Sequence, residues 1–162
     1  MELEKQAEVL NDLVKINNDR IKGYEKAIEQ LSDEDADLTP VFLDKIEDSR
    51  DYHTQIAAQI AMLGRDIETG TLLAGKIYRT WMDIKTFITG GDRRAILVSC
   101  ERGEDAAVIA YKTALKSEEL TYGQRQLLKE QLSEIEKSHE DIKLLLDVRR
   151  ETIKIEKTLK KN

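Results

Sequence analysis

Apolar residues recur three and four positions apart along most of this 162-residue chain, which contains one proline. In a helix this spacing gathers the apolar side chains on one face, and that face must be buried against another element. The spacing predicts four long helices, over Leu3–Leu31, Pro40–Leu63 and Arg93–Ser117 and from Thr121 toward the C-terminus. Leucine, alanine, glutamate and lysine are abundant, and these residues favour helices. The sequence therefore predicts an all-α protein.

Capping residues mark where the helices start and stop. Thr39 before Pro40 is typical of an N-cap and first helical position, and Asp92 has the N-cap role for the third helix. Thr121 with Gln124 three residues later has the pattern of a capping box. Gly64 is expected to close the second helix.

The lengths of the connections predict how the helices are joined. Short polar breaks separate the first helix from the second and the third from the fourth, so each pair should form an antiparallel hairpin. The connection over about residues 64–92 is long enough to cross the bundle, and Leu72–Thr89 within it has the spacing of a short amphipathic helix. This connectivity is that of a ferritin-like four-helix bundle with a long crossover that contains a short fifth helix. We expect residues 1–162 to form one domain, with a C-terminal helical extension over about residues 147–162.

Charge and composition narrow the classes of partner. The formal net charge of −6 argues against nucleic-acid binding, which needs a basic face. No apolar run approaches the roughly 18 residues that span a bilayer, and one cysteine excludes an internal disulfide framework. We expect a cytoplasmic protein with no membrane span. Trp81 on the amphipathic crossover helix suits packing or a subunit interface, so a homo-oligomer is one assembly that the sequence allows.

Each apolar stripe is interrupted near its middle by polar residues. Because buried polar groups need partners, interruptions at similar depth in four helices suggest that these side chains meet inside the bundle. In chain order they are Asn17 and Tyr24, Ser49 and His53, Glu101 and Glu104, and Glu136 and His139.

A partial metal-ligand pattern lies among these residues. Ferritin-like di-metal bundles use two Glu-x-x-His motifs and one glutamate from each of the other two helices. Glu136 and His139 form one such motif; Glu25 and either Glu101 or Glu104 could supply the lone carboxylates. Such ligands suit iron, manganese or zinc.

The second motif is broken, because Arg50 lies three residues before His53 where a carboxylate is needed. Two hypotheses follow. In the first, a non-enzymatic protein holds a buried polar network that includes Asn17, Tyr24, Arg50 and Tyr111, with Arg50 neutralising Glu101 or Glu104. In the second, a metal-binding or redox protein uses Glu25, Glu101 or Glu104, Glu136 and His139, with His53 as a further ligand. The sequence offers no nucleophile–base pair that would predict a catalytic site.

Three segments resemble a bacterial family of ferritin-like four-helix-bundle proteins of unknown function. They are the first helix over Leu10–Glu25, the crossover over Ala74–Lys85 with Thr89–Asp92, and Cys100–Ala106 with Tyr111 after it. The resemblance implies a ferritin-like fold, a bacterial cytoplasmic setting and an association with stress responses. It implies no established reaction.

Overall fold

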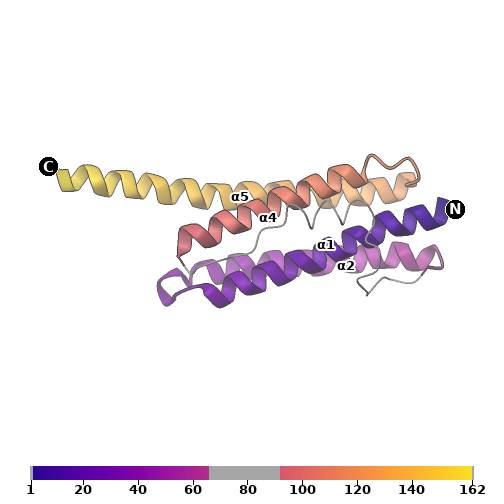
Figure 1. The fold of residues 1–162 in the computed structure, drawn as a ribbon, viewed down its shortest axis with the longest axis horizontal. Helices are drawn as coiled ribbons and strands as arrows, with labels where there is room; N and C mark the ends of the chain where they lie inside the picture. The colour runs from indigo at the N-terminus through magenta and orange to yellow at the C-terminus, as the bar shows by residue number, and fades with distance from the viewer. Residues whose placement is uncertain (1, 66–91, 162) are drawn as a thin grey trace.

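Four long helices form the part of the chain that the computed structural model describes, residues 2–65 and 92–161 (Figure 1). They are α1 (Glu2–Gln30), α2 (Leu38–Met62), α4 (Arg93–Ala114) and α5 (Tyr122–Lys161), and a 3-10 turn, η1 (Asp33–Asp35), joins α1 to α2. No strand occurs in these residues. The prediction of an all-α four-helix bundle is confirmed, whereas the fifth helix predicted at 72–89 lies outside the described residues.

The connectivity of the bundle follows from where its helices end. α1 packs against α2 and α4, and α5 packs against α4 and α2. The two hairpins α1–α2 and α4–α5 lie side by side, and α2 ends at the end of the bundle opposite to the one where α4 begins (Figure 1). The chain between α2 and α4 therefore has to connect opposite ends of the bundle.

Helix ends agree with most of the capping predictions. Asp92 Oδ1 accepts a hydrogen bond from the Ala95 amide at 2.8 Å, and Thr121 and Gln124 form the reciprocal bonds of a capping box. Gly64 has φ +69° just after α2, a conformation that favours glycine. The predicted Thr39 cap is wrong: α2 begins at Leu38 with Asp37 as N-cap, so Thr39 lies inside the helix.

The core has two apolar clusters, one toward each end of the bundle. Leu13, Ile56 and Leu128 belong to the first, and Phe42 and Leu97 to the second. Buried polar residues lie between them along each helix, so the apolar stripes are interrupted at one level of the bundle. Those residues are Arg20 on α1, Lys45 and Ser49 on α2, Glu104 on α4 and Ser138 on α5.

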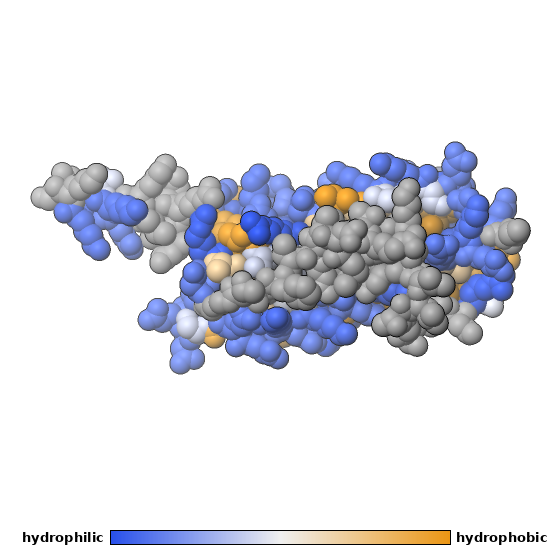
Figure 2. Space-filling view, in the orientation of Figure 1, coloured by the Kyte–Doolittle hydropathy of each residue, from blue (hydrophilic) through white to orange (hydrophobic). Residues whose placement is uncertain are grey.

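The outer surface is mostly hydrophilic on the face drawn in Figure 2, with small apolar areas that include one where α5 leaves the bundle. Among the described residues, no helix is long and apolar enough to cross a membrane. α5 has 40 residues and continues past the end of the other three helices (Figure 1).

Candidate functional site

A single guanidinium connects all four helices at the polar level of the bundle. Arg20 projects inward from α1 and is almost completely buried. Its Nε donates to Glu104 Oε1 at 2.7 Å on α4, and its NH2 group donates to Glu104 Oε2 at 3.1 Å and to Ser138 Oγ at 3.0 Å on α5. Its NH1 group donates to the Lys45 carbonyl at 3.1 Å and to Ser49 Oγ at 2.6 Å on α2. All five N–H donors of the side chain therefore have acceptors.

Glu104 is the anion of this site, and both of its oxygens are engaged. Besides Arg20, it accepts a hydrogen bond from the Tyr24 hydroxyl at 2.6 Å. Burial by itself raises the pKa of Glu104, but the charge of Arg20 and the hydrogen bonds from Arg20 and Tyr24 outweigh it and hold the pKa below its ordinary value. Burial and the neighbouring carboxylate raise the pKa of Tyr24 well above its usual range. The carboxylate thus stays ionised and the phenol stays protonated.

Lys45 brings a second cation to the edge of the same site. Its Nζ donates to Ser138 Oγ at 2.8 Å and lies 3.9 Å from Asp141 Oδ2 on α5. Burial lowers the pKa of Lys45, against the attraction of Glu104. Ser138 therefore accepts from both Lys45 and Arg20, and a small hydroxyl joins the two cations.

A second polar layer crosses the bundle next to the first. Asn17 Nδ2 donates to the Tyr111 hydroxyl at 2.8 Å, and this hydroxyl donates to Gln131 Oε1 at 2.7 Å. Gln131 Nε2 donates in turn to Gln55 Oε1 at 3.0 Å. The four side chains come from α1, α4, α5 and α2, so this chain of neutral hydrogen bonds also fixes the register of every helix against the others.

Arg50, expected inside the bundle, lies on its surface. Its side chain is 64% exposed, and its NH2 nitrogen is 3.6 Å from Glu25 Oε1, which is also exposed. The prediction that Arg50 neutralises Glu101 or Glu104 is wrong. Arg50 follows the buried Ser49 by one residue, a turn of about 100° that takes it off the buried face.

The other expected ligands also lie toward the outside, except Glu104. Glu136 is exposed, and His139 Nε2 is 3.8 Å from Glu101 Oε1, with both side chains partly exposed. His53 Nδ1 is 2.9 Å from Asn18 Oδ1. Among the described residues, no three histidine, cysteine, aspartate or glutamate side chains gather where they could hold a metal ion.

The residues at the centre do not fit the di-metal centre of a ferritin-like bundle. That centre requires carboxylates and imidazoles that project inward from four helices. Here the inward side chains are a guanidinium, an ammonium group, three hydroxyls and one carboxylate whose oxygens both bind the guanidinium. Arg20 stays positively charged and repels a cation. The site binds its helices to one another and leaves neither oxygen of Glu104 free for an ion.

Three residues at the polar level of the bundle are not predicted from the sequence: Arg20, Lys45 and Ser138. Arg20 gave a signal, since it lies three residues after Asn17 and four before Tyr24, on the same face of α1. Arginine and lysine are rarely buried without a partner, and the partner here is 84 residues away in sequence. Spacing alone therefore places Arg20 on the face without indicating its charge partner.

The chain matches one protein family over residues 5–117, the Domain of unknown function (DUF2383). The chain belongs to this family. The match includes most of α1 and all of α2 and α4, and it agrees with the resemblance found in the sequence. No curated protein matches the chain.

Two solved structures share the fold of this DUF2383 member. One is the F47E mutant of Dps1 from Mycobacterium smegmatis, with a TM-score of 0.79, 20% identity, and coverage of 90% of this chain and 97% of that one. The other is a ferritin-like, diiron-carboxylate protein from Bacillus anthracis, with a TM-score of 0.69, 18% identity, and coverage of 90% and 98%. At these identities the likeness shows the ferritin-like fold alone.

Proposed function

We propose that this chain is a non-enzymatic helical-bundle protein in which a buried ionic network takes the place of a di-metal centre. The observation that carries the proposal is that all five donors of Arg20 are bonded within the bundle. A metal ion in the same space would have to displace the guanidinium from both oxygens of Glu104. Because arginine keeps its proton at every pH at which proteins are folded, its charge opposes cation binding throughout.

The metal content of the purified protein tests this proposal. The chain would be produced in cells supplied with iron, manganese and zinc, purified without chelators and analysed by mass spectrometry for elements. We expect much less than one metal ion per chain. A stoichiometric amount of any of the three metals would overturn the proposal.

The same proposal assigns the protein a role in assembly, with a second copy of the chain as partner. Large apolar side chains on the surface support it, among them Leu43, Met62, Leu144 and Val148. The oligomeric state in solution, measured by sedimentation, tests this part separately. The cytoplasmic setting and the association with stress responses, which the family resemblance implies, stay predictions.

A second candidate function is metal binding or redox chemistry at a partial site. The observation that favours it is the approach of His139 to Glu101, which brings an imidazole and a carboxylate together from α5 and α4. Iron, manganese or zinc would suit these ligands. Replacing His139 by alanine should then abolish metal uptake while the far-UV circular dichroism spectrum is unchanged. Uptake that persists in His139→Ala would exclude the site.

A further inference from the structure

The C-terminal part of α5 extends beyond the bundle without another described helix beside it. α5 has 40 residues, against 29 in α1, 25 in α2 and 22 in α4. With the long axis of the molecule horizontal, its last turns lie past the ends of the other helices (Figure 1). A helix in this position has to be polar on all sides or has to bury its apolar face against a partner.

This extension is not polar on all sides. Leu144 and Val148 are 59% and 64% exposed, and Ile155 and Leu159 are 59% and 69% exposed. Their spacing of four, seven and four residues places them on one face of the helix. These four residues form an apolar stripe, and no other helix among residues 2–65 and 92–161 covers it.

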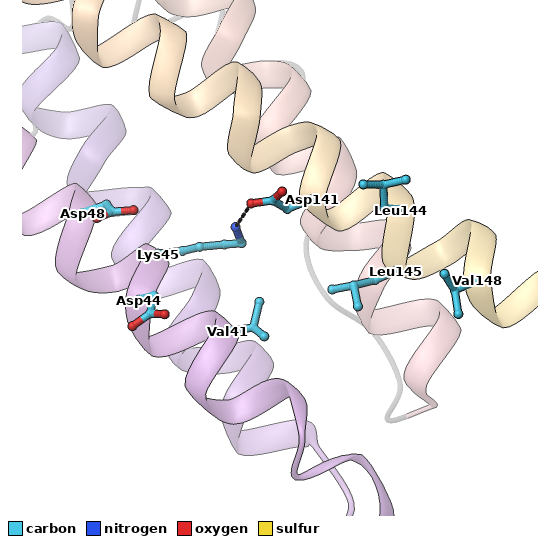
Figure 3. A pocket seen from close by; sticks show the side chains of 8 residues that line it. All are labelled: Val41, Asp44, Lys45, Asp48, Asp141, Leu144, Leu145 and Val148. Atoms are coloured by element: carbon cyan, nitrogen blue, oxygen red, sulfur yellow. Dashed lines mark ion pairs between the residues drawn. The ribbon is translucent and has the colours of Figure 1, made fainter.

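A groove of about 500 Å³ begins where this apolar face meets the bundle, between α5 and α2. Val41 of α2 lies across from Leu145 and Val148 of α5 (Figure 3). The polar rim of the groove is mostly acidic, with one lysine that is already paired with an aspartate. The rim residues are Asp44, Asp48, Asp141 and Lys45.

The charge of the extension is opposite to that of the groove. Residues 149–161 contain six basic and two acidic residues, although the chain as a whole has a net charge of −6. The basic residues are Arg149, Arg150, Lys154, Lys157, Lys160 and Lys161. The extension therefore has the charge and the apolar face that the groove would attract, but it cannot bend back as a straight helix to reach its own groove.

We propose that the partner of this face is the extension of a second copy of the chain, packed antiparallel. The spacing of four, seven and four is the same in both directions. An antiparallel copy therefore places Leu159 opposite Leu144 and Ile155 opposite Val148, and the same pairs recur on the other side of a two-fold axis. The basic end of each extension then lies at the acidic groove of its partner. The inference rests on the homo-oligomer of the proposed function and assigns its interface.

Sedimentation velocity of the full chain over a range of concentrations tests the interface. Ile155→Glu puts two charges into the apolar interface of each dimer, one from each chain. We expect the dissociation constant of the dimer to rise about 100-fold or more. Lys157→Gln is the matched control: it lowers the charge by the same one unit on the opposite face of the helix and should leave a stable dimer. Both positions are exposed, so both variants should keep the helical spectrum of the wild type.

Cross-linking tests the orientation. One population would carry Val148→Cys and a second, affinity-tagged population Ile155→Cys, both with Cys100→Ala. A short bismaleimide should join the two populations in the mixture much faster than it joins Val148→Cys chains to each other. Preferential cross-linking of Val148→Cys to itself would indicate parallel helices and overturn the inference.

The outcomes also separate this inference from the proposal on which it rests. A dimer that persists in Ile155→Glu would overturn the interface but leave the homo-oligomer. A wild-type chain that is monomeric at all concentrations would overturn both. A monomer that binds vesicles containing phosphatidylserine through the same face would instead identify an anionic membrane as the partner.

Discussion

Replacing Arg20 by methionine should strongly destabilise the bundle. Methionine keeps much of the aliphatic volume but removes the charge, which leaves the carboxylate of Glu104 buried without its cation. Removing one partner of a buried ion pair costs about 3–5 kcal/mol. Because small domains have only about 5–15 kcal/mol of stability, this is a large fraction of the total. At about 2–4 °C per kcal/mol for a chain of this size, the midpoint of thermal unfolding should fall by about 6–20 °C.

The double variant Arg20→Met, Glu104→Met distinguishes a lost ion pair from lost packing. With both charges gone, the buried charge is no longer uncompensated and most of the loss should be recovered. The Tyr24 hydroxyl would still lack its acceptor, which costs about 1–3 kcal/mol. Urea unfolding at pH 7, followed by far-UV circular dichroism, measures both variants. The reasoning is refuted if Arg20→Met loses less than about 1 kcal/mol, or if the double variant is no more stable than Arg20→Met.

The pH dependence gives the single variant a further signature. In Arg20→Met, burial raises the pKa of Glu104 above its unfolded value, because the main opposing charge is gone. As the pH falls, the buried carboxyl takes up its proton and its cost disappears. The difference in stability between Arg20→Met and the wild type should therefore shrink toward acidic pH. A difference that grows with acid would contradict the assignment of charge to Glu104.

Three further predictions concern other buried groups. Because the pKa of Glu104 is lowered by folding, this residue stabilises the wild type above the unfolded pKa of about 4.3, and the contribution is lost as the pH falls through the folded pKa. The free energy of unfolding of Glu104→Gln should therefore depend less on pH in this acidic range than that of the wild type. Burial raises the pKa of the Cys100 thiol to about 12, so this thiol should not react with a disulfide reagent at pH 8 unless the protein is unfolded. Tyr111→Phe removes the hydroxyl that joins Asn17 to Gln131 and should cost about 1–3 kcal/mol in urea unfolding, whereas Tyr122→Phe at an exposed position should cost almost nothing.

The fold could be predicted from the sequence because local patterns determine it. Stripes of apolar residues gave the four helices, and the length of the chain between Gly64 and Asp92 gave the crossover. The predicted helix ends were less accurate. Thr39 and Pro40 have the composition of a helix start, but α2 begins at the buried Leu38, so packing of this leucine in the core outweighs the capping preference.

The central site could be predicted only in part. The spacing of Tyr24 and Glu104 places both on buried faces, but it cannot indicate which cation they meet. Glu25 and Arg50 each lie one residue beyond a buried position, and a rotation of about 100° moves such side chains to the surface. The Glu-x-x-His pattern predicted that Glu136 points into the bundle, but the buried residues of this turn are Ile135 and Ser138, and Glu136 is exposed.

The ion pair between Arg20 and Glu104 also limits the order in which the bundle can form. Arg20 belongs to the α1–α2 hairpin and Glu104 to the α4–α5 hairpin, so neither hairpin can bury its charge until the other is docked. A half-formed bundle would have to keep its polar level in water, and with it the apolar residues on both sides. We therefore expect the described helices to unfold in a single cooperative transition, with no populated intermediate that contains one folded hairpin.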